Sequence, residues 1–130
     1  NATVIKVNTG ADLALLRVEK NISDGLPFTD VLEPEAGTEV WAMGTPSSLE
    51  LGQSISKGIV SGIRAANGMN YLQTDAKVSP GNSGGALINR KGEIFGIVTM
   101  KLIGTGTEGV GFAIPTSEVL KKLKIRYSQH

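Results

Sequence analysis

Residues 81–88 are Gly81-Asn82-Ser83-Gly84-Gly85-Ala86-Leu87-Ile88, a serine enclosed by glycines and followed by an apolar run typical of a β-strand. A serine that attacks a carbonyl group needs an open hydroxyl and backbone N–H groups directed at the oxyanion that forms. Glycine permits the tight turn that directs them there. This stretch therefore predicts a nucleophile at Ser83, and such a nucleophile also needs a general base.

The glycines along the rest of the chain indicate an all-β domain. There are 17 of them, and they separate short runs rich in β-branched residues, which is the pattern of a barrel or a sandwich. Asn67-Gly68 and Lys91-Gly92 are expected to form hairpin turns. We expect strands at residues 3–7, 12–18, 38–43, 53–63, 69–74, 85–89, 93–101 and 109–114.

Only the C-terminal end has the pattern of a helix. Pro115 suits the first helical position, and Val119, Leu120 and Leu123 form one apolar stripe. Residues 20–37 are polar and contain two prolines, which indicates a linker between two strands.

Composition excludes several classes of function. A chain of 130 residues with a net charge of +1 and no basic stripe is a single small domain that is not built to bind nucleic acid. The absence of cysteine excludes a disulfide scaffold and a thiolate site, and one histidine cannot build a ligand cluster. We therefore expect no metal and no cofactor. No apolar run approaches the length of a membrane span.

Two motifs in the chain match other enzyme classes by pattern alone. Residues 81–85 satisfy G-x-S-x-G, but the nucleophile elbow needs a helix after the serine, and here a strand follows. Residues 104–109 satisfy G-x-G-x-x-G, but the dinucleotide fingerprint must open a helix, and this copy also precedes a strand. A hairpin loop is the better interpretation of the second motif.

The serine segment resembles the active-site segment of trypsin-like serine proteases, in the form used by the bacterial HtrA/Deg group. Five further segments match in the same order and at similar spacing, so the resemblance covers nearly the whole chain. They are Asp12-Leu13-Ala14-Leu15-Leu16, Gly44-Thr45-Pro46, Ser56-Lys57-Gly58-Ile59-Val60-Ser61, Gln73-Thr74-Asp75-Ala76 and Gly109-Val110-Gly111-Phe112-Ala113-Ile114-Pro115.

The resemblance implies an all-β, chymotrypsin-like fold made of the second β-barrel plus two strands of the first, closed by a C-terminal helix. On that mapping, residues 1–19 are a remnant of the first barrel and residues 20–37 are the inter-barrel linker. Residues 38–114 form the second barrel, and residues 115–130 form the helix and a tail.

The resemblance also implies residue roles. Ser83 is the nucleophile that forms an acyl-enzyme, and the backbone N–H groups of Gly81 and Ser83 form the oxyanion hole. Asp12 maps onto the aspartate that orients the catalytic histidine.

Substrate binding is implied along one strand. A peptide would add to Thr99-Met100-Lys101, and the specificity pocket would lie between Val78 and that segment. Lys77 falls near the pocket base, so an acidic floor is not expected, and Val78 with Met100 favours a small or medium aliphatic residue. Plain core packing explains Met100 equally well.

The general base is missing from its expected place. In this family the histidine precedes the aspartate, yet none of the eleven residues before Asp12 is histidine. The sole histidine, His130, follows the helix at a free end where chains fray, which disfavours it as a repositioned base. We therefore expect a serine endopeptidase fragment that hydrolyses peptide bonds through Ser83 only when the histidine is supplied from elsewhere.

Two alternatives to this interpretation remain. One is a non-catalytic, protease-like module that binds peptides, although the presence of Ser83, Gly81 and Asp12 together favours the enzyme. The other is an unrelated serine esterase that uses His130. Residues 64–69 and 102–108 match regulatory loops of the family, and two simple hairpin turns explain them equally well.

The resemblance also bears on partners and location. The expected partners are a polypeptide substrate and either the missing first-barrel segment or a second copy of the chain, which would make a homo-oligomer. Because members of the group are usually extracytoplasmic, the resemblance implies a location in the bacterial periplasm or cell envelope.

Overall fold

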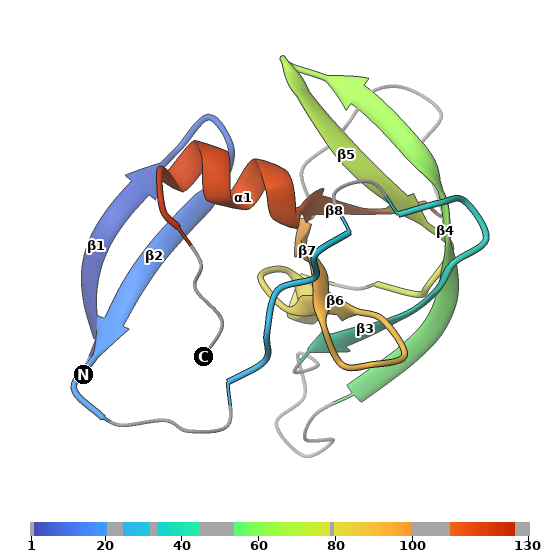
Figure 1. Cartoon of the computed structure of the whole chain (residues 1–130), viewed down its shortest axis with the longest axis horizontal. Coiled ribbons are helices and arrows are strands. Elements are labelled where there is room, and N and C mark those ends of the chain that lie inside the picture. Colours follow the sequence, from blue (N-terminus) through green and yellow to red (C-terminus); the bar gives the residue numbers. More distant parts are fainter. Residues whose placement is uncertain are drawn as a thin grey trace.

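The structure is a computed structural model, and it describes residues 2–20, 25–31, 34–44, 54–78, 80–99 and 110–126. Strands β1 (Ala2–Asn8) and β2 (Leu13–Val18) pair as an antiparallel hairpin, apart from a closed six-stranded barrel in the order β3-β4-β5-β8-β7-β6 (Figure 1). The barrel strands are β3 (Glu39–Gly44), β4 (Ser54–Ala66), β5 (Met69–Thr74), β6 (Ala86–Ile88), β7 (Ile94–Thr99) and β8 (Gly111–Pro115).

These strands confirm the expected fold class. Each expected strand has a counterpart, and β4 continues to Ala66, where the turn at Asn67 and Gly68 begins. Both turn residues have positive φ, 54° and 76°, as a type I′ hairpin turn requires. Expected strand positions 53, 100, 101 and 109 lie outside the described residues.

The helix α1 (Thr116–Leu123) begins one residue later than expected. Pro115 has φ −65° and ψ 153°, an extended conformation, and it pairs with Gly96 as the last residue of β8. The expectation that Pro115 is the first helical residue is therefore wrong, because its pairing with β7 keeps it in the sheet. No helix in the described ranges is long and apolar enough to cross a membrane.

Two apolar clusters hold the fold together, and removing their side chains from water stabilises it by about 1.5–3 kcal/mol for each large one. One fills the barrel and includes Val40, Val60, Leu72 and Leu87. The other lies where the hairpin, α1 and the barrel meet. Helix α1 thus joins the hairpin to the barrel, as Figure 1 shows. Members of this second cluster include Ala11, Leu13, Tyr71, Phe112, Val119 and Leu123.

Part of the expected linker lies against the barrel. Phe28 forms a parallel bridge with Ile94 of β7. The N–H of Thr29 donates to the carbonyl of Ile94 at 3.0 Å, and the N–H of Ile94 donates to the carbonyl of Pro27 at 2.7 Å. These two bonds hold residues 27–29 against β7.

Candidate functional site

Ser83 lies in a turn between the 3₁₀ helix Pro80–Asn82 and β6, and its side chain is exposed. Gly84 has φ +87°, a conformation that glycine adopts without strain. The N–H of Gly84 donates to the carbonyl of Val98 at 2.8 Å, and the N–H of Gly85 donates to that of Asn82 at 2.9 Å. These bonds attach the turn to the end of β7, and Ser83 stays exposed to solvent.

The underside of this turn is closely packed against the end of β3. A Cβ on Gly85 would overlap the carbonyl oxygen of Met43, and one on Gly44 would overlap Asn82. Asn82 is only 5% exposed. Position 85 requires glycine because there is no space for a Cβ, whereas position 84 requires it because the backbone has positive φ.

A pocket of about 340 Å³ adjoins Ser83. The backbone of Gly81 and Gly85 forms part of its wall, together with Met43 and Gly44 from β3. Leu26, from the expected linker, closes another side. The pocket is large enough for one aliphatic side chain of a peptide.

Asp12 lies in the turn between β1 and β2, with φ 61°. The hydroxyl of Thr99 donates to Oδ2 of Asp12 at 3.3 Å. Thr99 ends β7, and its neighbour Val98 is the residue whose carbonyl accepts the N–H of Gly84. The structure thus brings Asp12 and the Ser83 turn to the same end of β7, although they are far apart in sequence.

The segment that leads to the serine turn is held against β4. The N–H of Ile59 donates to Oδ1 of Asp75 at 2.8 Å. The hydroxyl of Ser56 donates to the carbonyl of Lys77 at 2.5 Å. No site role was expected for Asp75, and the signal that points to it is Gly58, whose mid-strand position marks a close backbone approach. A Cβ there would overlap Asp75 and the backbone of Ala76.

Val78, expected to line the specificity pocket, is half-buried and adjoins the barrel interior. A Cβ on Gly111 would lie 3.0 Å from its Cγ2, so Val78 contacts the start of β8. Met100 and Lys101, also expected at the pocket, lie outside the described residues, as do His130, which was disfavoured as a base, and the loop at 102–108.

One titratable group near the hairpin has a shifted pKa. Burial raises the pKa of Tyr71 above its ordinary value of 10.0, and the negative charges of Glu118 and Asp12 raise it further. Within the described ranges, no three side chains of Asp, Glu, His or Cys cluster closely enough to hold a metal ion.

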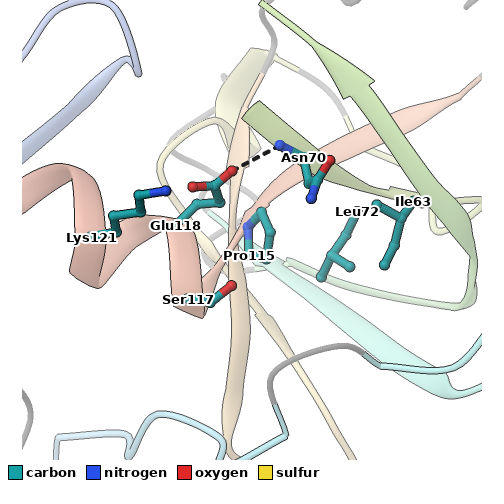
Figure 2. A pocket seen from close by; sticks show the side chains of 7 residues that line it. All are labelled: Ile63, Asn70, Leu72, Pro115, Ser117, Glu118 and Lys121. Atoms are coloured by element: carbon teal, nitrogen blue, oxygen red, sulfur yellow. Dashed lines mark hydrogen bonds between the residues drawn. The ribbon is translucent and has the colours of Figure 1, made fainter. Parts of the chain in front are cut away.

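A second pocket, of about 250 Å³, lies between α1 and the β4–β5 hairpin (Figure 2). Glu118 lines it, and the N–H of Asn70 donates to its Oε2 at 2.8 Å. Ser117 also lines it, but neither Ser83 nor Asp12 does. This pocket is therefore separate from the serine site, and the Glu118 contact attaches the first turn of α1 to β5.

Known proteins are similar to this chain in both sequence and fold. Residues 1–97 match the family described as trypsin-like peptidase domain. Over 92% of its length the chain is 39% identical to the serine protease Do-like HtrA of Lactobacillus helveticus, and it covers 32% of that protein. It is also 39% identical over 94% of its length to the serine endoprotease DegS of Haemophilus influenzae, of which it covers 39%.

Two solved structures are similar as well. The HtrA-type protease AlgW with a decapeptide has a TM-score of 0.79 at 32% identity, covering 95% of this chain and 39% of that one. The serine endoprotease from Yersinia pestis has a TM-score of 0.75 at 39% identity, covering 92% of this chain and 42% of that one. The chain spans about a third of the length of its curated relatives. Since one family match takes in most of the sequence, the chain belongs to the trypsin-like peptidase family, in the HtrA/Deg group of serine proteases.

Proposed function

We propose that this chain supplies the nucleophile, the oxyanion hole and the orienting aspartate of a serine endopeptidase. The observation that carries the proposal is the hydrogen bond of Thr99 to Asp12, beside the strand end that also holds the Ser83 turn. A histidine that accepts a hydrogen bond from Ser83 and donates one to Asp12 would complete the arrangement.

In the proposed reaction, Ser83 Oγ attacks the carbonyl carbon of a peptide bond and gives its proton to the histidine. The imidazolium returns that proton to the leaving amine, and the C–N bond breaks to leave an acyl-enzyme on Ser83. Water, deprotonated by the same imidazole, then releases the acid. Asp12 holds the imidazole in the required tautomer and stabilises its charged form.

We assign the oxyanion hole to the N–H groups of Gly81 and Ser83. In a 3₁₀ helix the carbonyl of residue i faces the N–H of residue i+3. The N–H of Ser83 is therefore directed at the carbonyl of Pro80, the first residue of the helix Pro80–Asn82. The hole therefore forms when this turn unwinds and releases that N–H to the substrate. Peptide binding is the event we expect to drive the change.

The outer face of the hairpin supports the view that further chain completes the site. Paired residues of β1 and β2 share a face, and the register puts only apolar residues on the face turned away from α1. Val4 is 58% exposed and Leu16 is 52% exposed. We propose that the rest of a first barrel, carrying the histidine, covers this face. The face consists of Ala2, Val4, Val7, Ala14, Leu16 and Val18.

Fluorophosphonate labelling tests the proposal. The reagent should modify Ser83 in the full-length product of the gene, with a Ser83→Ala variant as the unlabelled control. The 130-residue chain alone should label far more slowly and turn over no peptide, since loss of the base removes most of the triad's contribution. A full-length protein that neither labels at Ser83 nor cleaves peptides would contradict the enzymatic proposal.

A protease-like peptide-binding module is the second candidate. It is favoured by the solved AlgW structure, which holds a decapeptide. Calorimetric titration of peptides into the Ser83→Ala full-length protein distinguishes the two, because binding with no turnover by the wild type would favour the module.

We also propose an extracytoplasmic location, by analogy with the HtrA/Deg group. Cell fractionation tests this proposal.

A further inference from the structure

We propose that Asn8 is a positioning residue for Asp12, a role that rests on the proteolytic function proposed above. Asn8 is the last residue of β1 and is half-buried. Its Oδ1 accepts the N–H of Ala11 at 2.9 Å, and its Nδ2 donates to the carbonyl of Lys122 at 3.1 Å. One side chain therefore connects the turn that carries Asp12 to the last turn of α1.

The first of these bonds fixes the turn. Asp12 has φ 61°, a left-handed conformation that costs free energy in any residue other than glycine and must be held by its surroundings. Its own N–H donates to the carbonyl of Thr9 at 3.3 Å, a long bond that holds the turn weakly. The bond from Ala11 to Asn8 closes the turn one residue earlier and so directs the Asp12 carboxylate at Thr99.

The second bond anchors the turn to the barrel. The last carbonyls of a helix have no partner within the helix, and Asn8 satisfies that of Lys122. Ala11, only 2% exposed, contributes an apolar contact beside the same helix. Asp12 is thereby placed relative to the barrel that carries Ser83.

A neighbouring side chain provides a matched control. Lys6 Nζ donates to the carbonyl of Lys124 at 2.8 Å, so it also connects β1 to the end of α1. In the described part of the chain, none of the Lys6 hydrogen bonds reaches residues 9–12. Lys6→Ala therefore removes a tether of the hairpin without removing the closure of the turn.

Two variants of Asn8 separate positioning from general stability. Asn8→Ala removes both bonds, whereas Asn8→Asp keeps the acceptor for the Ala11 N–H. In the full-length protein we expect Asn8→Ala to lower kcat by about tenfold or more with KM unchanged, because small misplacements of a catalytic group are costly. Asn8→Asp should give a kcat between those of Asn8→Ala and the wild type, because its carboxylate still accepts the Ala11 N–H but cannot donate to the carbonyl of Lys122. Lys6→Ala should match the wild type in kcat.

The full-length protein also gives a readout that does not depend on proteolysis. In its NMR spectra we expect an NOE between Asp12 and Thr99 in the wild type, Lys6→Ala and Asn8→Asp, and its loss in Asn8→Ala. An unchanged NOE in Asn8→Ala, or a kcat for Asn8→Asp as low as for Asn8→Ala, would overturn the role of Asn8. Absence of proteolysis by the wild-type full-length protein would instead count against the proposed function, and the NOE would still decide the position of Asp12.

Discussion

Thr99 donates a hydrogen bond from Oγ1 to Oδ2 of Asp12 at 3.3 Å, across 87 positions of sequence. The bond joins the hairpin to the barrel strand that holds the Ser83 turn, and Thr99 itself is only 3% exposed. Because Asp12 is exposed, water replaces part of the interaction when the hydroxyl is removed.

Removing this hydroxyl should therefore cost stability, but moderately. Thr99→Val keeps the shape of the side chain and should lower the free energy of unfolding by about 1 kcal/mol. The measurement is urea unfolding followed by the fluorescence of Trp41, the single tryptophan of the chain. A double-mutant cycle with Asp12→Ala should give a coupling energy of at least about 0.5 kcal/mol. Strictly additive effects would show that the two side chains do not interact.

The two glycines after Ser83 should respond differently to alanine. Gly85→Ala forces a methyl group into the carbonyl of Met43 and should destabilise the chain by about 1–3 kcal/mol. Gly84→Ala meets no atom within 4 Å but must adopt φ +87°, which costs about 1–2 kcal/mol.

Gly62→Ala is the control for this pair. Gly62 is on β4, has no atom within 4 Å of the position of a Cβ, and does not have positive φ. It should stay within about 0.5 kcal/mol of the wild type, the range of ordinary surface substitutions. Calorimetric melting of the three variants compares them, and a neutral Gly85→Ala would show that the serine turn is not tightly packed against β3.

The local features of this fold could be predicted from sequence, whereas its long-range contacts could not. Glycines between β-branched runs predicted the strands, and the glycines around Ser83 predicted an exposed turn, because both follow from conformations of a few adjacent residues. The polar segment containing Phe28 was expected to be only a linker, but it bridges to Ile94. A single pairing of this kind leaves no periodic pattern in the sequence.

The site shows the same division. Only the family resemblance predicted a site role for Asp12, since nothing in its local sequence separates it from an ordinary polar residue. Its contact with Thr99 depends on how α1 seats the hairpin against the barrel, a packing relationship among segments far apart in sequence. Asn8 and Asp75 were missed for the same reason, because their partners, Lys122 and Ile59, are far away in the chain.

The apolar outer face of the hairpin should make the isolated chain self-associate. Val4, Val7 and Leu16 are each more than half exposed, at 58%, 59% and 52%, and exposed apolar surface of this kind marks an interaction site. We expect sedimentation equilibrium to show dimers or larger species that dissociate when Val7 and Leu16 are replaced by lysine. Replacing Ile59, an exposed apolar residue of the barrel, by lysine is the control and should leave association unchanged. A strictly monomeric wild-type chain at high concentration would contradict this expectation.

Tyr71 should make the chain less stable in alkaline solution. Burial, with smaller contributions from the charges of Glu118 and Asp12, raises its pKa in the folded state above the ordinary value of 10.0. A raised folded pKa gives a stabilising contribution that is complete below the unfolded pKa and is lost as the pH rises from about 10 through the folded pKa. One ionising group limits the slope to about 1.4 kcal/mol per pH unit.

This loss of stability can be isolated with two proteins that both carry Tyr127→Phe, which removes the second of the two tyrosines of the chain. One protein keeps Tyr71 and the other carries Tyr71→Phe as well. The Tyr71→Phe protein should lack the tyrosine contribution, so the difference in unfolding free energy between the two proteins should change with pH only in the alkaline range. Ultraviolet absorbance of tyrosinate gives the pKa directly. Adding Asp12→Asn should lower that pKa, because it removes one of the negative charges that disfavour the phenolate. A pKa at the ordinary value would show that the phenol is reached by water and that the cluster joining hairpin, helix and barrel is looser than its contacts indicate.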